Sequence, residues 1–228
     1  MRRTAVTAAG IVMLVLMTAA ASCSNEAGKK EGKVEDGKPT PQQAVEALKA
    51  GPGIFAVIDT SMGRIVTQLY PEVAPEGVAN FTGLAEGTKE FLDPMTRQPV
   101  KKNFYDGLTF HRVIPGFMIQ GGCPLGSGTG GPGYRFKNEV SEKLQFDKPG
   151  RLAYANAGKD TNGSQFFITH AATPWLNGNY TIFGQTLQGQ DVVDKIGSVE
   201  KGPNDRPVKP VMIDKISIVR IEEKKKDK

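Results

Sequence analysis

The 228-residue chain has few of the residues that build metal centres or disulfide frameworks. It contains two cysteines, Cys23 and Cys123, which excludes a disulfide-stapled scaffold and a cysteine-rich zinc site. Its two histidines, His111 and His170, are too few for a multi-histidine metal centre. The charge excess is small, with 29 Lys and Arg against 24 Asp and Glu. We therefore expect no metal, no cofactor and no nucleic-acid partner.

The N-terminus contains an apolar stretch that is shorter than a membrane-spanning helix. The stretch at residues 8–21 has 14 residues, whereas a membrane-spanning helix needs about 20. Two arginines follow Met1, which together with that stretch is typical of a secretory signal peptide, assigned here to residues 1–22. The small residues before Cys23 resemble the lipobox of bacterial lipoproteins, although Ala20 stands where such boxes usually carry leucine.

Lipidation of Cys23 would anchor the protein to a membrane on the extracytoplasmic side of a bacterial cell envelope. The alternative is ordinary signal cleavage, which leaves a soluble secreted or periplasmic protein. Residues 23–53 contain no aromatic residue and are polar up to Lys38, so we expect a flexible linker. Within this linker, Thr40 to Gln43 reads as a capping box with proline at the first helical position and predicts a short helix.

Residues 54–221 have the composition of a folded domain, and residues 222–228 form a charged tail. Short β-rich runs separated by glycine and proline predict eight strands. They lie at residues 54–60, 64–70, 108–114, 117–120, 151–155, 165–169, 181–183 and 212–221. Helical spacing of apolar residues predicts two helices, one from Pro75 to Gly87 and one at residues 190–196. The pattern favours an antiparallel barrel or sandwich.

Three familiar catalytic or binding motifs fail on inspection. Residues 128–133 match the dinucleotide pattern G-x-G-x-x-G, but no helix is expected to open there to meet a pyrophosphate. Ser164 lacks the G-x-S-x-G elbow of serine hydrolases. Cys123 is interpreted as a small apolar filler beside a glycine-rich loop rather than a thiol nucleophile.

Two long strings carry a family resemblance. Residues 110–122 read FHRVIPGFMIQGG, and residues 162–168 read NGSQFFI. Together with Ala155 to Gly158 and with Trp175-Leu176, they strongly resemble the cyclophilin-type peptidyl-prolyl cis-trans isomerases over residues 54–221. The resemblance implies a mainly β fold, an eight-stranded antiparallel barrel capped by two α-helices. It also implies proline-containing polypeptides as substrates and possible binding of cyclosporin, and we expect a monomer.

The resemblance also assigns a site, residue by residue. Arg112 matches the catalytic arginine. Phe117, Met118, Phe167 and Leu176 match the walls of the proline pocket, and Trp175 matches its rim. Gln120, Ala155, Asn156, Ala157 and Gln165 match positions that hold the peptide backbone, with Gly128 at the edge of the groove. Tyr180 stands where eukaryotic members usually have histidine, and Cys123 where many members have aspartate. An insertion around residues 86–103 is similar to that of bacterial members.

The chemistry of an X–Pro bond explains why no nucleophile or metal is needed. Rotation is opposed by roughly 18–20 kcal/mol because the amide nitrogen shares its lone pair with the carbonyl. A guanidinium aimed at the nitrogen of the twisted amide would bind the transition state more tightly than either planar form. Two other hypotheses stay open: a proline-peptide-binding module or holdase with little catalysis, and a structural lipoprotein that merely inherits the fold. We expect His111, on the opposite strand face from Arg112, to be structural, and His170 to be a surface or turn residue.

Overall fold

A computed structural model describes residues 37–223. The predicted signal peptide, Cys23, most of the predicted linker and the last five residues of the tail lie outside the described residues. The predicted domain boundaries at these ends stay predictions.

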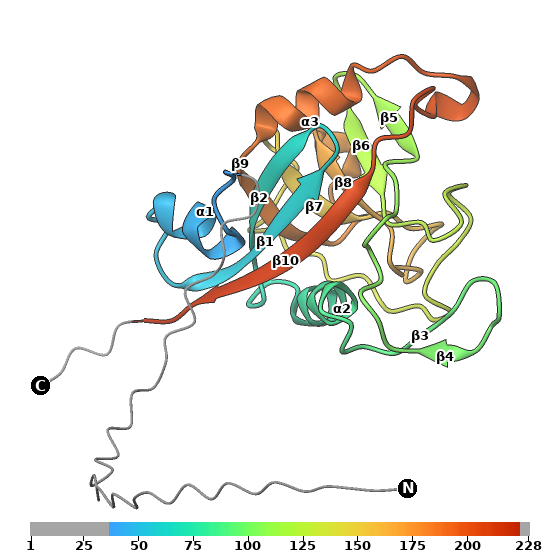
Figure 1. Ribbon diagram of the computed structural model, residues 1–228, viewed down its shortest axis with the longest axis horizontal. Helices are drawn as coiled ribbons and strands as arrows, with labels where there is room; N and C mark the ends of the chain where they lie inside the picture. The colour runs from blue at the N-terminus through green and yellow to red at the C-terminus, as the bar shows by residue number, and fades with distance from the viewer. Residues whose placement is uncertain (1–36, 224–228) are drawn as a thin grey trace, which may run out of the picture. The chain divides into compact units, whose positions relative to one another are not determined.

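One antiparallel sheet contains all eight predicted strands, in the order β10-β1-β2-β9-β7-β8-β6-β5 (Figure 1). The strands are β1 (Gly53–Thr60), β2 (Gly63–Leu69), β5 (Arg112–Ile114), β6 (Met118–Gly121), β7 (Arg151–Tyr154), β8 (Phe166–Thr169), β9 (Ile182–Gln188) and β10 (Ile213–Ile221). The strand β9 runs further than predicted, and β5 begins four residues later. The turn between β1 and β2 has two residues instead of three, because Gly63 already pairs with Thr60.

The sheet curls until its two edges meet. Just before β5, Thr109 forms an antiparallel bridge to Met212. The amide of Gly107 donates to the carbonyl of Ile213 at 2.8 Å, and the amide of Ile213 donates to the carbonyl of Leu108 at 2.7 Å. These bonds join the two edges at one end of the sheet, as expected for the predicted eight-stranded antiparallel barrel.

Three α-helices lie within residues 37–223: α1 (Pro41–Ala47), α2 (Pro75–Ala85) and α3 (Gln190–Gly197). The two predicted caps are α2 and α3, whose apolar residues pack into the main core (Figure 1). The third is the short linker helix α1, which begins with the predicted capping box between Thr40 and Gln43. It covers the outer face of β1, β2 and β10, where Ala44 and Val45 pack against Phe55 and Val219.

The N-terminus of α2 is capped by a glutamate from a distant part of the chain. Ala74, at the N-cap position, has no side chain that can accept hydrogen bonds. The carboxylate of Glu139 accepts from the amide of Glu76 at 3.0 Å and from the amide of Gly77 at 2.8 Å. This satisfies two of the amides that a helix leaves open at its N-terminus. Two short strands, β3 (Phe91–Leu92) and β4 (Pro99–Val100), form a separate hairpin in the segment interpreted as an insertion.

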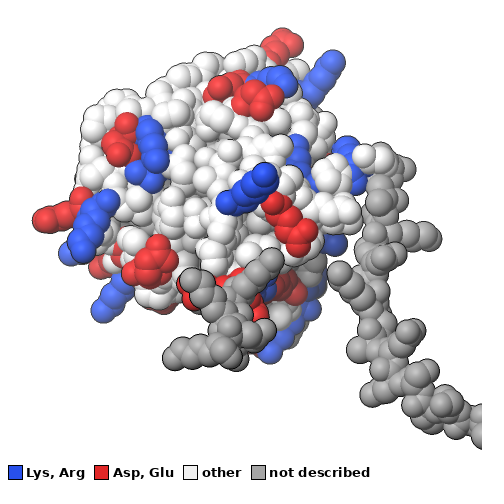
Figure 2. Space-filling model, turned by 90° about the vertical axis from the view of Figure 1, so that its left-hand side faces the viewer, with Lys and Arg blue, Asp and Glu red and all other residues white. Residues whose placement is uncertain are grey.

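Charged side chains of both signs are mixed on one face of the molecule. On the face drawn in Figure 2, Lys and Arg side chains are interspersed with Asp and Glu side chains. Such mixing keeps the long-range field weak, so that the charges next to a binding site determine its preference. Among residues 37–223, no helix is both long and apolar enough to span a bilayer.

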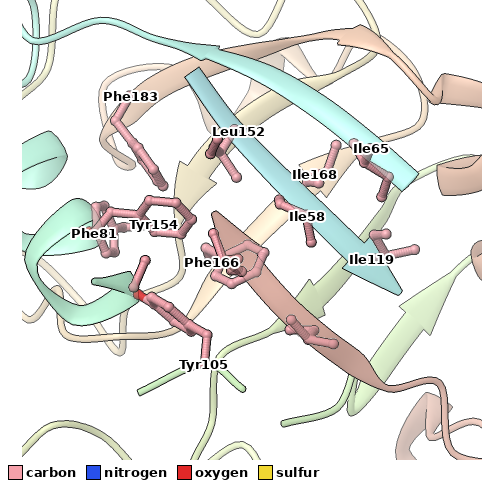
Figure 3. Close-up of a cluster of buried hydrophobic side chains, with 14 of the residues drawn as sticks. Ile58, Ile65, Phe81, Tyr105, Ile119, Leu152, Tyr154, Phe166, Ile168 and Phe183 are labelled. Carbon is pink, nitrogen blue, oxygen red and sulfur yellow. The ribbon is translucent and has the colours of Figure 1, made fainter. Parts of the chain in front are cut away.

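Aromatic rings fill the core between the sheet and α2. The ring of Phe81 on α2 lies 5.1 Å from that of Tyr105, 5.5 Å from that of Phe166 and 5.2 Å from that of Phe183 (Figure 3). The buried hydroxyl of Tyr154 donates to the carbonyl of Gly77 at 2.8 Å. This packing compensates for the two glycines inside α2, which lower the intrinsic stability of the helix.

Candidate active site

The strands β5, β6 and β8 place three predicted site residues in one row. Arg112 lies directly opposite Gln120, and Gln120 lies opposite Phe167. Directly opposed residues share one face of a sheet, and side chains alternate between faces. Accordingly Val113, Ile119, Phe166 and Ile168 enter the main core. The row therefore lies on the outer face of the sheet, where Arg112 is exposed and its Nη1 lies 3.4 Å from Oε1 of Gln120.

A second apolar cluster begins beside this row. Four of the predicted pocket residues belong to it: Phe117, Met118, Phe167 and Leu176. Met118 and Phe167 are 2% and 4% exposed. The ring of Phe167 meets that of Tyr180 edge-on, with centroids 5.7 Å apart. Tyr180, which stands where eukaryotic members usually have histidine, thus contributes an aromatic wall to the cluster.

The indole of Trp175 lies at the rim of this cluster. It belongs to a short 3-10 helix, η1 (Pro174–Leu176), and is 64% exposed. Its ring lies 6.0 Å from that of the half-buried Phe117. Leu176, the next residue, turns inward and is 8% exposed.

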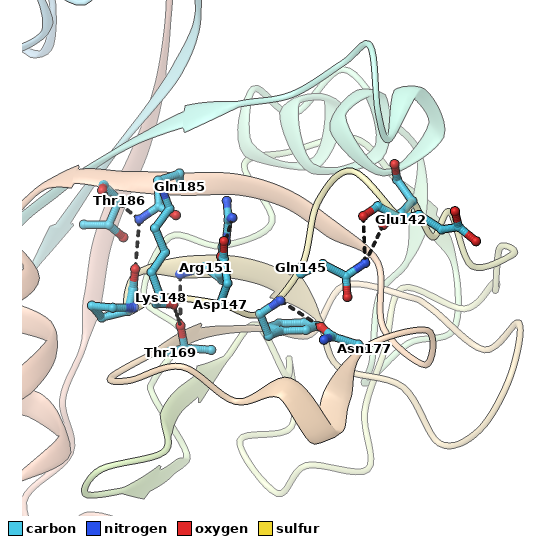
Figure 4. A network of polar contacts seen from close by, with 12 residues as sticks. Glu142, Gln145, Asp147, Lys148, Arg151, Thr169, Asn177, Gln185 and Thr186 are labelled. Atoms are coloured by element: carbon cyan, nitrogen blue, oxygen red, sulfur yellow. Dashed lines mark hydrogen bonds and ion pairs between the residues drawn. The ribbon is translucent and has the colours of Figure 1, made fainter.

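The floor of the cluster includes an aromatic residue that the sequence reasoning missed. Phe146 is fully buried, and its ring stacks on that of Phe167 with centroids 5.8 Å apart. Its amide donates to Oδ1 of Asn177 at 2.8 Å, in the polar network of Figure 4. The only signal was the pair Leu144 and Phe146, two apolar residues in a polar stretch without strand or helix periodicity.

Two glutamine side chains connect the row to the glycine-rich loop. Nε2 of Gln120 donates to Oε1 of Gln165 at 2.9 Å. Nε2 of Gln165 donates to the carbonyls of Gly128 and Gly130, both at 2.8 Å. From the other side, the buried thiol sulfur of Cys123 accepts from the amides of the same two glycines at 3.2 and 3.3 Å. Cys123 therefore does more than fill space, because it fixes the loop.

The predicted backbone-holding segment lies beside Gln165. The amide of Ala155 donates to the carbonyl of Gln165 at 2.9 Å. Nδ2 of Asn156 donates to the carbonyl of Asn179 at 3.1 Å, and the amide of Ala157 donates to Oγ1 of Thr161 at 2.9 Å. These contacts hold the segment as an ordered wall outside the regular strands.

Two grooves meet at Gln120 and Gly128. The first has a volume of about 820 Å³, and Ala155, Asn156, Ala157 and Gln165 also line it. The second has a volume of about 810 Å³ and contains Arg112. The predicted site residues thus divide between the two grooves and the apolar cluster, and Ala155 belongs to both the first groove and the cluster. Cys23, the predicted lipidation site, lies outside the described residues.

Part of each histidine prediction is wrong: His111 does not point to the opposite face from Arg112, and His170, which lies in a bend after β8, is not at the surface. His111 lines the same groove as Arg112, because the strand begins only at Arg112 and strict alternation does not extend to the residue before it. Burial lowers the pKa of His111 to about 4, and neither ring nitrogen has a hydrogen-bond partner in the described part of the chain. The side chain of His170 is only 7% exposed, because it packs against Gly197 of α3 instead of facing solvent.

The candidate nucleophiles weighed from the sequence have structural roles. Ser164 is buried, and its hydroxyl donates to the carbonyl of Gly122 at 2.8 Å. Cys123 is 1% exposed and accepts the two loop amides described above. The exposed group of the row is instead the guanidinium of Arg112, which lies beside a largely buried apolar cluster, and neither of these is a nucleophile.

Comparisons with known proteins agree with this geometry. A family model described as "Cyclophilin type peptidyl-prolyl cis-trans isomerase/CLD" matches residues 55–218. The chain is 53% identical over 165 residues to a "Probable peptidyl-prolyl cis-trans isomerase A" of Mycobacterium leprae, covering 72% of this chain and 91% of that protein. It is 48% identical over 168 residues to a "Peptidyl-prolyl cis-trans isomerase B" of Streptomyces anulatus, covering 72% and 96%.

Solved structures show the same likeness. A cyclophilin-type isomerase of Cryptosporidium parvum superposes with a TM-score of 0.65 at 31% identity, covering 74% of this chain and 98% of that one. A second structure of that protein, in the presence of the dipeptide Ala-Pro, has a TM-score of 0.64.

Proposed function

This chain belongs to the cyclophilin-type peptidyl-prolyl cis-trans isomerases, and from that premise we propose how its site accelerates rotation about X–Pro bonds and where the enzyme works. It is an isomerase, and its substrates are proline-containing polypeptides. The proposal concerns the role of Arg112, the exported nature of the substrates, the lipid anchor and cyclosporin binding.

Arg112 supplies the catalytic charge in this proposal. The observation that carries it is the row on the outer face, in which an exposed guanidinium lies beside Gln120 and next to the apolar cluster around Phe167. Arg112 takes part in none of the ion pairs found among residues 37–223, so no carboxylate there neutralises it. Its charge is therefore available to a substrate.

The reaction needs only differential binding. As the X–Pro amide twists, its resonance is lost and the lone pair localises on the proline nitrogen. With the pyrrolidine ring held against Phe117, Met118 and Phe167, the guanidinium donates toward that nitrogen. The interaction is stronger in the twisted form than in either planar form, and only such a difference lowers the barrier. Gln120 and the backbone at Asn156 hold the peptide on one side of the bond while the other side rotates.

Turnover of a short X–Pro peptide by the described domain tests this role. Replacing Arg112 with alanine should lower kcat/KM by on the order of 10²–10³, the loss typical of removing one preorganised donor. Arg112→Lys should recover little, because an ammonium lacks the planar fork of donors. Lys215→Ala, which removes an exposed charge on β10 outside both grooves, is the control. Unchanged kcat/KM in Arg112→Ala contradicts the assigned role, and bound peptide that interconverts no faster supports the holdase alternative.

The second part of the proposal is the cellular setting. Cys23 and its flanking residues support lipidation, and export would place the enzyme among unfolded exported chains on the extracytoplasmic side of the bacterial envelope. Mass spectrometry of the mature N-terminus tests this directly. A diacylated or triacylated cysteine as residue one is expected, and Cys23→Ala should release the protein from membranes. A free N-terminus after a small residue would instead support the soluble secreted or periplasmic form.

Cyclosporin binding is the third part, and Trp175 supports it. The indole is exposed at the rim of the apolar cluster and is the only tryptophan of the chain, so its fluorescence reports on this surface alone. We also propose that the protein is a monomer. A titration that follows Trp175 fluorescence should show saturation at micromolar cyclosporin or below, and Trp175→Phe should weaken cyclosporin binding measured by calorimetry. Affinity only in the millimolar range would contradict this part.

A further inference from the structure

The groove beside Ala155–Ala157 carries positive charge without a compensating carboxylate. Arg97 and Arg135 line it, together with Leu125 and the glycine-rich loop, whereas Arg112 lines the other groove. No Asp, Glu or Lys is among its lining residues. Both arginines are exposed, and neither joins an ion pair within residues 37–223. Two arginines that have no ion-pair partner in the described part of the chain thus line one groove.

The β3–β4 hairpin, at the lower right of Figure 1, holds Arg97 next to the groove. The amide of Leu92 donates to the carbonyl of Pro132 at 2.9 Å. The contact is close, since a Cβ atom on Gly133 would lie 2.6 Å from Cγ of Leu92. At the tip of the hairpin, the amide of Arg97 donates to the carbonyl of Asp93 at 2.9 Å. Arg97 is therefore part of an ordered turn packed on the glycine-rich loop.

Neighbouring carboxylates are already engaged. Oδ1 of Asp93 accepts from the amides of Met95 and Thr96 at 3.0 and 3.1 Å, and Lys102 lies 3.3 Å from Oδ2. On the other side, Oδ1 of Asp160 accepts from the amide of Asn138 at 2.9 Å. Neither carboxylate forms an ion pair with Arg97 or Arg135, and these two arginines are the only charged residues that line the groove.

The residue after Arg135 holds the backbone of this segment. Phe136, its neighbour, is buried and bridges to Asn162 in an extended pairing. Arg135 itself is exposed and lines the groove. The bridge at Phe136 thus fixes the backbone next to Arg135.

We propose that this groove selects proline peptides that carry an acidic side chain on the flank that lies along Ala155–Ala157, with Arg97 and Arg135 as the specificity-determining residues. The inference rests on the proposed function, because Gln120, Gln165 and Ala155–Ala157 line both the groove and the substrate surface. A peptide held by those residues would place a side chain near its proline in the groove. A carboxylate there meets two donors whose planar forks match its geometry.

The test uses matched blocked peptides that differ only in Glu or Gln. One pair carries the variable residue two positions before the proline, and a second pair carries it two positions after. The measured quantity is the ratio of kcat/KM for the Glu and Gln peptides. An exposed ion pair contributes about 1.4- to 5-fold, so two arginines predict a ratio of roughly 2- to 25-fold in one of the pairs. The ratio should fall toward one in about 1 M salt, where charges are screened within about 3 Å.

Variants then assign the preference to the groove. The double substitution Arg97→Gln and Arg135→Gln should reduce the ratio to about one. Lys209→Gln removes the same net charge from an exposed position outside both grooves and should leave the ratio unchanged. A preference that persists in the double variant, or equal rates for Glu and Gln in both pairs, would overturn the inference.

A failure of the proposed function is separable from a failure of this inference. If no peptide is isomerised, the catalytic proposal fails, and Trp175 fluorescence titrations with the same peptides still measure the Glu-to-Gln ratio as a ratio of Kd values. If the Gln peptides are isomerised without any preference for Glu, only the inference fails.

Discussion

Gln165 connects the substrate-facing row to the glycine-rich loop, and Gln165→Leu removes this connection while keeping similar side-chain volume. Three hydrogen bonds disappear: one accepted from Gln120 and two donated to the carbonyls of Gly128 and Gly130. A typical hydrogen bond contributes about 1 kcal/mol to stability, which sets an upper figure of roughly 3 kcal/mol. Gln165 is only half-buried, so water replaces part of the loss. We expect the free energy of unfolding to fall by about 1–2 kcal/mol.

The same substitution should lower activity, because Gln120 loses the partner that fixes its amide beside Arg112. We expect kcat/KM to fall by about tenfold, which corresponds to about 1.4 kcal/mol of transition-state stabilisation. Urea unfolding measures the first effect, and peptide turnover measures the second.

Gln185→Leu is the matched control. Like Gln165, Gln185 donates from its side chain to a backbone carbonyl, that of Pro149 at 2.9 Å (Figure 4). Gln185 is buried, but it lies on β9 outside both grooves. The Gln185→Leu variant should have a lower free energy of unfolding but an unchanged kcat/KM. If Gln165→Leu retains full activity, or if Gln185→Leu loses as much activity as Gln165→Leu, the network does not position the site and the reasoning is wrong.

Three further perturbations follow from the structure. Phe146→Ala should lower the free energy of unfolding by about 3–5 kcal/mol and raise KM, because it opens a cavity beneath Phe167; a normal urea midpoint would contradict this. Glu139→Ala should cost about 0.5–2 kcal/mol in urea unfolding by uncapping α2, and no loss would mean that water caps the helix equally well. His111 keeps its neutral form in the fold, with a pKa lowered from 6.5 to about 4, so the unfolded chain takes up a proton first as the pH falls. The free energy of unfolding should therefore decline between pH 6.5 and pH 4, by up to roughly 3 kcal/mol, and the decline should shrink in His111→Gln; identical pH profiles would refute it.

The sequence predicted the eight strands because their apolar runs are bounded by turn residues. It predicted α1 and α3 equally well, because the Thr40 capping box and the apolar spacing of Val192, Val193 and Ile196 are local signals. The family strings led to the site residues, and the structure places the described ones in two adjoining grooves or in and around the neighbouring apolar cluster. Their roles stay predictions until they are measured.

What the sequence did not predict depends on contacts between distant residues. Glu139 caps a helix that begins more than sixty residues earlier, and no local pattern indicates that pairing. Phe146 belongs to the pocket floor only because Asn177, far along the chain, holds its amide. The segment at residues 86–103 was interpreted only as an insertion, and its β3–β4 hairpin was not predicted, since two-residue strands show no periodicity. The groove at Arg97 therefore could be found only in the folded molecule.

The central claim is that Arg112 binds the twisted amide better than the planar one. Magnetisation-exchange NMR on a peptide saturated with enzyme measures the cis–trans rate of the bound peptide, separately from its Kd. The account predicts that Arg112→Gln slows bound-state rotation by on the order of a hundredfold or more, while Kd changes by less than about threefold. A variant that binds much more weakly yet rotates the bound peptide at the wild-type rate would contradict it.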